Sequence, residues 1–208
     1  MRCAGLVLAA GAGSRFGGGK VRAPLEGRPL VGHVLAAARA AGLGRVVLVL
    51  GRDAAEVLAA VREADEGALD GVLVALNGAP ERGLSTSLRL GLAAATAAPA
   101  PMGVVVLLGD QPRVRPEVVR MLVDAASAAP APTLAVVPAY AREAAPNPAL
   151  LLRPAWLLAA GIDGDRGVGG LLAARPDLVV HVAVGGANPD VDTPQDLAAL
   201  AALDQAHP

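Results

Sequence analysis

Cysteine and aromatic residues are nearly absent from this 208-residue chain. Cys3 is its only cysteine, so a disulfide within the chain is excluded and a reducing, cytoplasmic location is expected. Phe, Trp and Tyr occur once each, too few to stack the bases of a single-stranded nucleic acid. Hydrophobic residues still make up 54% of the chain, so Leu, Val and Ala must build the core.

An excess of charge of one sign and long hydrophobic runs are also lacking. The formal net charge is −1, so the chain lacks the excess of basic residues that is typical of nucleic-acid-binding proteins, and no nucleic-acid partner is expected. No uninterrupted apolar run approaches the roughly 18 to 20 residues of a membrane helix, so no membrane partner is expected. The three histidines and one cysteine form no cluster typical of zinc. No serine lies in the G-x-S-x-G context of a hydrolase.

The length fits a single α/β domain over residues 1–208. Short apolar runs alternate with segments of helical periodicity. The expected strands are 3–9, 45–50, 72–76, 103–108, 133–138, 149–152 and 178–184. The expected helices are 29–41, 54–63, 85–96, 116–128, 154–160, 167–174 and one from Pro194. This alternation predicts a mostly parallel sheet covered by helices on both faces.

Three polar turns follow expected strands, at residues 10–20, 77–85 and 109–113. Ligands of open parallel sheets bind beyond the carboxyl ends of the strands. The three turns are therefore expected to meet at one edge of the sheet and to form the site there.

The first turn contains five glycines together with Arg15 and Lys20. Glycines leave room for backbone N–H groups to face a ligand, and the two cations complement phosphates. The turn is not a P-loop, because Val21 follows the lysine, and not a dinucleotide fingerprint, because Phe16 replaces its third glycine. Two cations on a long loop suit a nucleoside triphosphate. The alternative is a glycine-rich turn with solvated basic side chains.

Three carboxylates could hold a metal ion. Asp110 directly follows the buried strand 103–108, and Asp190 and Asp192 lie on one side of an extended segment. Magnesium bound to nucleotides usually takes one or two protein carboxylates. Asp110 fits the first ligand, and either Asp190 or Asp192 the second. The alternative is that Asp110 caps its turn or the following helix, and that the other two favour the start of the last helix.

Two further segments combine a turn with a helix start. Hydroxyls at Ser85, Thr86 and Ser87 could hold a base or ribose, although ordinary helix capping would also explain them. At the last helix, Thr193 is the expected N-cap and Asp196 the N3 residue of a capping box.

Taken together, these segments resemble the MobA-like nucleotidyltransferases, and within them the molybdenum-cofactor cytidylyltransferase branch. The matching stretches are Leu8-Ala9-Ala10-Gly11, Ser14-Arg15-Phe16-Gly17, Lys20, Pro24–Leu30, Gly83–Arg89, Gly109-Asp110-Gln111-Pro112, Asn147-Pro148, Gly164–Gly167 and Asp192–Asp196. Each stretch is weak alone, but their order and spacing hold from about residue 5 to residue 200.

The resemblance implies a Rossmann-like three-layer sandwich of the nucleotide-diphospho-sugar transferase type. It implies transfer of a nucleoside monophosphate from NTP to a phosphorylated acceptor, with release of pyrophosphate. Arg15 and Lys20 would then hold the triphosphate, Asp110 would bind Mg²⁺, and Asp192 would complete the metal site. The resemblance assigns the nucleotide to Leu8, Ala9, Ala10, Gly11, Ser14, Arg15, Lys20, Asn77, Gly83, Ser85 and Asp110.

The choice of base and acceptor depends on single positions within the resemblance. Ala10 stands where cytidylyltransferases have Ala and guanylyltransferases tend to have Gly, and Gly19 stands before Lys20 where the latter tend to have Asp. This favours CTP, with molybdopterin as acceptor and a molybdoenzyme or its chaperone as recipient of the product. Asn147 departs from the His of many cofactor cytidylyltransferases.

Three alternatives stay open at the level of sequence. The first is a nucleotidyltransferase that uses GTP or another phosphorylated acceptor. The second is an NAD(P)H-dependent oxidoreductase of the nicotine-blue-oxidoreductase type on the same fold. The third is a nucleotide-binding protein without catalysis, which the retained Arg15, Lys20 and Asp110 make less attractive.

Overall fold

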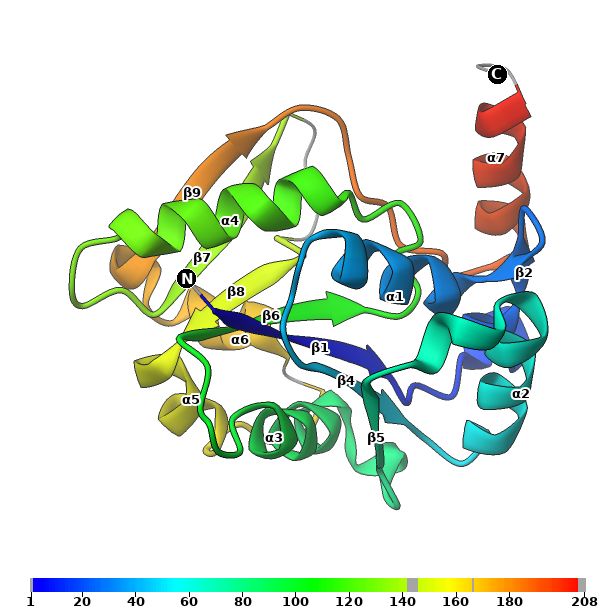
Figure 1. Ribbon diagram of the computed structural model, residues 1–208, viewed down its shortest axis with the longest axis horizontal. Coiled ribbons are helices and arrows are strands. Elements are labelled where there is room, and N and C mark those ends of the chain that lie inside the picture. Colours follow the sequence, from blue (N-terminus) through cyan, green and yellow to red (C-terminus); the bar gives the residue numbers. More distant parts are fainter. Residues whose placement is uncertain (1, 142–145, 166, 206–208) are drawn as a thin grey trace.

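A seven-stranded sheet forms the centre of the molecule, in the order β5-β4-β1-β6-β8-β7-β9 (Figure 1). The computed structural model describes residues 2–141, 146–165 and 167–205. The strands are β1 (Cys3–Ala9), β4 (Val46–Leu50), β5 (Val72–Leu76), β6 (Gly103–Leu108), β7 (Ala135–Tyr140), β8 (Ala149–Leu152) and β9 (Val179–Val184). Every residue of β1 and β4 is buried, as expected of central strands covered on both faces.

The direction of the strands decides where the loops gather. β1 pairs in parallel with β4 and β6, β4 with β5, and β7 with β9. Within the described sheet, β8 alone runs against its neighbours β6 and β7. The carboxyl ends of six strands and the start of β8 therefore share one edge.

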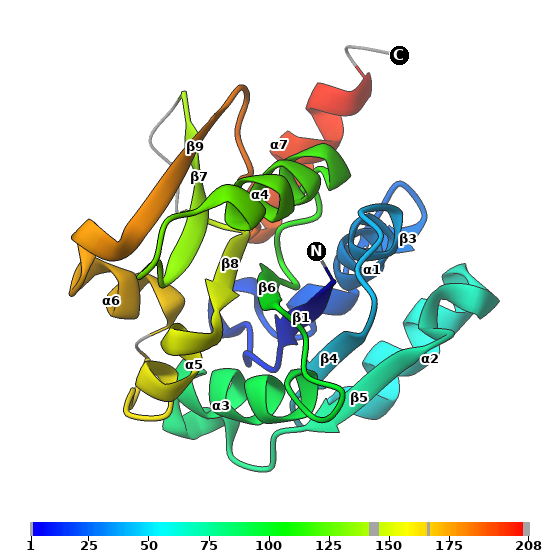
Figure 2. The same ribbon diagram turned by 60° about the vertical axis from the view of Figure 1, so that its left-hand side comes forward.

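The helices divide between the two faces of the sheet (Figure 2). One face is covered by α1 (Leu30–Ala40), α2 (Ala54–Ala64) and α4 (Pro116–Ala128), and the other by α3 (Leu84–Ala95), α5 (Arg153–Ala159) and α6 (Val168–Ala173). Side chains alternate along a strand. In β1, Val7 and Ala9 therefore pack under the first group of helices, and Leu6 and Leu8 under the second.

A short hairpin and the last helix form a separate small core. Strands β2 (Pro24–Leu25) and β3 (Arg28–Pro29) pair around Glu26 and Gly27, whose φ angles are 52° and 77°. Positive φ at both turn residues is the geometry of a tight two-residue hairpin. Leu25 packs with Val191 and with Leu200 of α7 (Pro194–Gln205). This contact anchors the chain end beside the glycine loop.

The expected strands and helices are present, with bounds within two residues of those predicted. The predicted strand 133–138 lies at 135–140, and the helix predicted from Pro29 begins at Leu30. The sequence did not predict the β2–β3 hairpin, because two-residue strands carry no readable alternation. It also did not predict the 3₁₀ helices η1 (Ser14–Phe16), η2 (Lys20–Arg22), η3 (Glu66–Leu69), η4 (Pro80–Arg82) and η5 (Pro176–Leu178).

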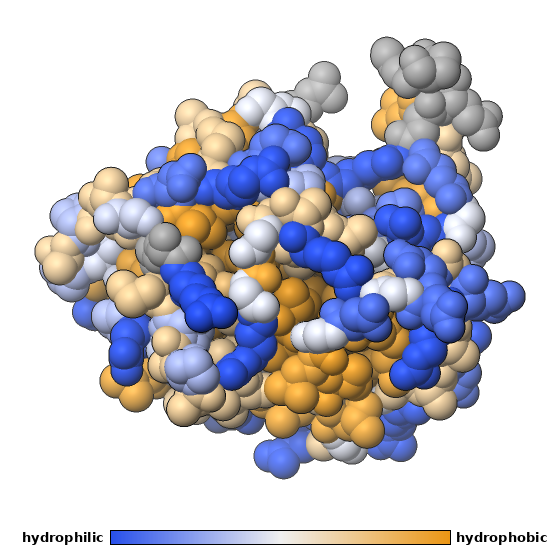
Figure 3. Space-filling view, in the orientation of Figure 1, coloured by the Kyte–Doolittle hydropathy of each residue, from blue (hydrophilic) through white to orange (hydrophobic). Residues whose placement is uncertain are grey.

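The surface carries an apolar area between α1, α3 and β5 in the view of Figure 3. β5 is an edge strand, and its residues Leu73 and Leu76 are 48% and 64% exposed. In the described part of the chain, none of the helices combines the length and the apolar character that crossing a bilayer requires.

Candidate active site

The glycine loop after β1 folds back on itself through two 3₁₀ turns. Gly13, Gly17, Gly18 and Gly19 all have positive φ, between 58° and 97°, a region that other residues rarely adopt. A Cβ on Gly13 would lie 2.9 Å from the Cβ of Lys20, so a side chain there would push the two ends of the loop apart. The glycines thus bring two distant points of the loop together.

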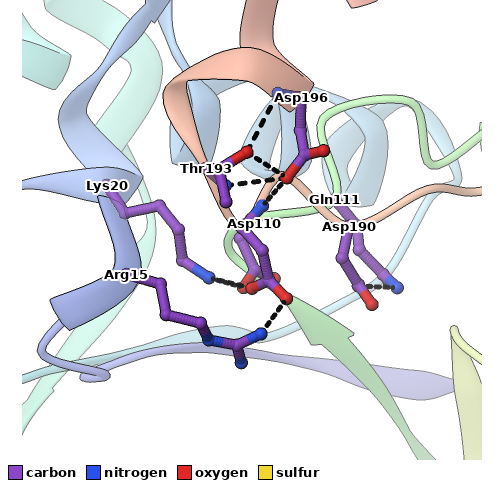
Figure 4. Close-up of polar contacts among 8 residues, drawn as sticks. Arg15, Lys20, Asp110, Gln111, Asp190, Thr193 and Asp196 are labelled. Carbon is purple, nitrogen blue, oxygen red and sulfur yellow. Dashed lines mark hydrogen bonds and ion pairs between the residues drawn. The ribbon is translucent and has the colours of Figure 1, made fainter. Parts of the chain in front are cut away.

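Two cations of this loop meet two carboxylates from distant segments (Figure 4). Lys20 Nζ donates to Asp110 Oδ2 at 2.6 Å and to Asp192 Oδ1 at 3.0 Å. Arg15 Nη1 donates to the other oxygen of Asp192, Oδ2, at 2.9 Å. Asp110 follows β6 and Asp192 precedes α7, and the Val191 N–H donates to the Asp110 carbonyl at 2.9 Å, which ties the two segments together.

Lys20 is the only lysine in the chain, among 18 Lys and Arg residues in all. Its side chain is 13% exposed and that of Asp110 is 22% exposed, whereas Arg15 is 76% exposed. Burial disfavours the charged ammonium, but hydrogen bonds and charge from Asp110 and Asp192 outweigh it, so the pKa of Lys20 is raised. Lys20 therefore stays protonated and acts as a fixed positive charge.

Asp190 faces a different partner. Its Oδ1 accepts a hydrogen bond from Gln111 Nε2 at 2.6 Å, and Figure 4 shows the two side chains turned toward each other. Asn188 Nδ2 donates to Gln111 Oε1 at 3.0 Å and to the Asn147 carbonyl at 3.3 Å. Burial raises the pKa of Asp190, and the charges of Asp110 and Asp192 add to this, although the Gln111 bond opposes it. A polar network thus runs from the carboxylates to the start of β8.

The predicted capping box forms at the start of α7. Thr193 Oγ1 accepts from the Asp196 N–H at 3.2 Å, and Asp196 Oδ2 accepts from the Thr193 N–H at 2.7 Å. Asp196 Oδ2 also accepts from the Asp192 N–H at 3.0 Å. The helix is therefore capped by Thr193 and Asp196, which leaves the side chain of Asp192 available to the cations.

The predicted nucleotide residues fall into two groups. Leu8 and Ala9 end β1, Ala10 and Gly11 begin the glycine loop that carries the two cations, and Ser14 begins η1 in the same loop. Asn77, by contrast, is buried and donates to Thr86 Oγ1 and Ser87 Oγ at 2.8 and 2.9 Å, so its amide holds the start of α3. This geometry gives Asn77 a structural task, and its predicted contact with the nucleotide stays untested.

Gly83 and Ser85 lie where α3 meets the segment before α6. A Cβ on Gly83 would lie 2.3 Å from the Gly164 carbonyl carbon, so only glycine permits this approach. The Ser85 N–H donates to the Gly164 carbonyl at 3.1 Å. The Ser85 hydroxyl is buried, and no described group hydrogen-bonds to it. Gly83 and Ser85 therefore fix the start of α3 against the segment that precedes α6.

A hollow of about 330 Å³ opens beside the glycine loop. Its walls are residues 10–12 after β1, Arg52 and Asp53 after β4, and Pro80 and Glu81 of η4. Arg52 Nη2 and Glu81 Oε2 form an ion pair of 3.2 Å between two of these loops. Sequence reasoning did not single out Arg52 or Asp53, although their place directly after a parallel strand would have indicated this edge.

Asp110 and Asp192 are the candidate ligands of a divalent cation. In the described part of the chain, no three His, Cys, Asp or Glu side chains gather as a metal site of their own. Asp110 and Asp192 nevertheless reach the same ammonium, so both can reach one cation. Magnesium prefers oxygen ligands, and beside nucleotides takes one or two carboxylates with phosphate oxygens and water. The pair fits a cation that arrives with phosphates.

Comparison of the sequence with known families and proteins finds relatives of this chain. A profile of the MobA-like NTP transferase domain matches residues 5–179. The bifunctional protein GlmU of Pelobacter propionicus is 42% identical over 118 residues, which are 54% of this chain and 23% of GlmU. The chain thus spans about a quarter of the length of the curated relative it matches.

Solved structures match over the whole fold. The crystal structure of Rv0371c from Mycobacterium tuberculosis H37Rv has a TM-score of 0.84 at 35% identity and covers 97% of this chain and 98% of its own. The same protein in complex with manganese has a TM-score of 0.79 at 32% identity. A nucleotidyl transferase from Methanothermobacter thermautotroptrophicus, 22% identical with a TM-score of 0.75, covers 100% of this chain and 99% of its own and shares the fold.

Proposed function

Because the chain belongs to the MobA-like NTP transferase family, we propose that it is a nucleotidyltransferase and transfers CMP from CTP to the phosphate of a molybdopterin-type acceptor. The observation that carries the proposal is the contact of Lys20 and Arg15 with Asp110 and Asp192 at the carboxyl edge of the sheet. A molybdoenzyme or its chaperone would receive the product.

The reaction joins an oxygen of the acceptor phosphate to the α-phosphorus of CTP. The bond from that phosphorus to the β-phosphate breaks, and pyrophosphate leaves with the electron pair. Such transfers depend on positioning and on neutralising negative charge more than on acid–base catalysis. The buried Lys20 would neutralise negative charge on the triphosphate. The more exposed Arg15 would neutralise the charge that develops on the leaving pyrophosphate.

The hollow beside residues 10–12 is the proposed place of base and ribose. Its volume of about 330 Å³ falls within the roughly 300 to 1,000 Å³ typical of ligand pockets. It opens next to Ala10, the position that favours CTP over GTP in the resemblance. The backbone of residues 8–11 would line the base, while Asn77, Gly83 and Ser85 would shape the wall by holding the start of α3.

Mg²⁺ is the proposed metal, with Asp110 as its first ligand and Asp192 as its second. Asp192 is preferred over Asp190 because it shares a cation with Asp110, whereas Asp190 is held by Gln111 at 2.6 Å. When bound, the metal supplies further neutralisation of phosphate charge. The manganese complex of the relative Rv0371c supports the use of a divalent cation.

The test is pyrophosphate release from CTP, GTP, ATP or UTP with Mg²⁺ and molybdopterin, on wild type and on Asp110→Asn. We expect release with CTP, and a loss of about 10²-fold or more in the variant, as when a group that stabilises transition-state charge is removed. The matched control is Asp177→Asn, an exposed carboxylate in η5, which should behave as wild type.

Each other outcome has a definite meaning. Full activity of Asp110→Asn would overturn the assignment of the site. Pyrophosphate release with GTP alone would support the proposed reaction but show that the nucleotide is GTP and not CTP. Saturable binding of NADPH together with no binding of CTP would reject the proposal in favour of an oxidoreductase.

A further inference from the structure

Three carboxylates of the described chain lie close together at the carboxyl edge of the sheet, and two of them meet the cations. Asp110 and Asp192 both contact Lys20 Nζ, at 2.6 and 3.0 Å. Asp190 lies two residues before Asp192, but its Oδ1 accepts from Gln111 Nε2 at 2.6 Å (Figure 4). Nearness along the chain therefore does not explain why Asp190 has a different partner.

The side-chain amide of Gln111 is buried and hydrogen-bonded at both ends. Gln111 is 1% exposed, and its Oε1 accepts from Asn188 Nδ2 at 3.0 Å while its Nε2 donates to Asp190. A buried amide group that loses its partner costs free energy, so both bonds hold the side chain in one orientation. In that orientation the donor end of the amide faces Asp190.

The direction of these hydrogen bonds is set at the start of β8. The carbonyl of Asn147 can only accept, and it accepts from Tyr140 Oη at 2.9 Å and from Asn188 Nδ2 at 3.3 Å. Because Asn188 turns its Nδ2 toward that carbonyl, the same Nδ2 faces Gln111 Oε1. Gln111 must then present Nε2 to Asp190. An oriented series of donors and acceptors thus runs from a backbone carbonyl to one carboxylate.

The charge balance of the site shows what this arrangement achieves. The two cations of the glycine loop balance the two carboxylates that they contact. A third carboxylate would make the site negative before a triphosphate binds. It would also strengthen the binding of a divalent cation without phosphates, because cation affinity depends on the number of charged ligands. Two carboxylates suit a cation that brings phosphate oxygens of its own.

We propose that Gln111 is a positioning residue that keeps Asp190 out of the cation site, so that a divalent cation binds weakly until the phosphates of the nucleotide join it. The inference rests on the proposed function, which assigns the metal to Asp110 and Asp192. The Val191 N–H donates to the Asp110 carbonyl at 2.9 Å, so the backbone of Asp190 lies beside Asp110. Loss of the Gln111 amide would leave Asp190 free to turn toward the cation.

The test is calorimetric titration with Mn²⁺ alone. Gln111→Met keeps an unbranched side chain of similar length and removes the hydrogen-bond donor. We expect this variant to bind Mn²⁺ about tenfold more tightly than wild type, because a third carboxylate joins the site. A purely structural role of Gln111 would leave the affinity unchanged or lower it. Gln111→Met combined with Asp190→Asn is the matched control, and its affinity should return to the wild-type value because residue 190 then carries no charge.

Asp190→Asn alone is the second variant, and it keeps the contact because an asparagine Oδ1 also accepts from Gln111 Nε2. It should bind Mn²⁺ with wild-type affinity, whereas Asp192→Asn should bind it at least about tenfold more weakly. Weaker binding in Asp190→Asn would overturn the inference, because Asp190 would then be a ligand. Unchanged affinity in Gln111→Met would overturn it too, as would tighter binding that persists in the combined variant. Asp190→Asn decides the question if Gln111→Met does not fold.

CTP binding is measured on the same proteins to separate the two proposals. In wild type, CTP should tighten Mn²⁺ binding more than it does in Gln111→Met, which already holds the cation with three carboxylates. CTP binding and turnover by wild type, with unchanged Mn²⁺ affinity in Gln111→Met, would reject the positioning role alone. The expected changes in Mn²⁺ affinity, with no CTP binding to wild type, would reject the proposed function and keep the role of Gln111 in holding Asp190.

Discussion

Lys20 illustrates how the charge balance of the site depends on one residue. Its Nζ lies between Asp110 and Asp192, at 2.6 and 3.0 Å. An ammonium is a compact point charge, whereas a guanidinium is a planar fork that needs room for two parallel bonds. Every other side chain counted as Lys or Arg in this chain is Arg. The geometry gives a physical reason for a lysine here.

We predict that Lys20→Met lowers kcat for CTP about 10²- to 10³-fold, the range for loss of one preorganised charge-stabilising group. The melting temperature should also fall, because Asp110 would lose its ammonium partner and Asp192 would keep only Arg15. Steady-state pyrophosphate release and thermal unfolding measure the two effects.

Lys20→Arg is the matched variant for this prediction, because it keeps the charge and changes the shape. It should recover part of the stability and little of the activity. An Arg variant with wild-type kcat would contradict the argument from shape.

Among the helices and strands, specific contacts hold the starts of α3 and α7 in place. Gly83 precedes α3 and touches the backbone of Gly164, and the Ser85 N–H bonds the same residue. The last helix is held by its capping box and by the packing of Leu200 on Leu25. Both contacts fix the position of segments that carry site residues.

Gly83→Ala tests the first contact. The residue has φ 102°, and its Cβ would lie 2.3 Å from the carbonyl carbon of Gly164, so backbone strain and a clash add together. We expect a loss of about 3 kcal/mol. Gly71→Ala is the control, because Gly71 has φ 70° with nothing within 4 Å, and should lose about 1 kcal/mol from strain alone. Equal losses in urea unfolding would refute the close approach.

Asp196→Asn tests the second contact through pH. Hydrogen bonds from the Thr193 side chain and from backbone N–H groups lower the pKa of Asp196 below its usual 3.8. A lowered folded-state pKa stabilises the fold above pH 3.8, and this contribution is lost as pH falls through the folded-state value. Wild type should therefore melt above the variant at neutral pH. The difference should shrink as pH falls below 3.8 and vanish below the lower folded-state pKa.

Thr193→Ala is the companion variant at this helix start. It should lower stability by about 1 kcal/mol at neutral pH through loss of the N-cap. The loss should shrink in acid, because the Thr193 hydroxyl also stabilises the ionised form of Asp196. A difference between wild type and Asp196→Asn that persists at the most acidic pH would show that the carboxylate is not the stabilising group.

At the scale of the whole molecule, the sheet brings loops from the two ends of the chain to one edge. Arg15 and Asp192 are 177 residues apart and in contact. A ligand that bridges these loops binds only the folded chain, and therefore stabilises all of it.

We predict that Mg²⁺ with CTP raises the melting temperature by about 5 to 10 °C at a hundredfold excess over Kd, from about 2.7 kcal/mol of added stability. The shift should disappear with EDTA and in Asp110→Asn. Thermal-shift measurements with CTP, GTP and NADPH check it, and a shift with NADPH in place of CTP would count against the proposed nucleotide.

Much of the fold was predictable because burial imposes local periodicity. The short apolar runs at residues 3–9 and 103–108 form strands, and the segment 116–128 forms a helix, at the expected places. The antiparallel direction of β8 was not predictable, since its four apolar residues carry no sign of direction. The hydrogen bond between Gln111 and Asn188 was not predictable, because the two amide residues are 77 positions apart and belong to no recognisable sequence motif.

The order of strands and helices, the family, and the candidate side chains Arg15, Lys20, Asp110 and Asp192 could all be read from the amino-acid sequence. These depend on local spacing and residue type, which the chain carries along its length. Which carboxylates meet Lys20, and that Asp190 instead faces Gln111, became visible in the folded chain alone. Those relations depend on strand order and loop paths, which arise when segments up to 177 residues apart pack together.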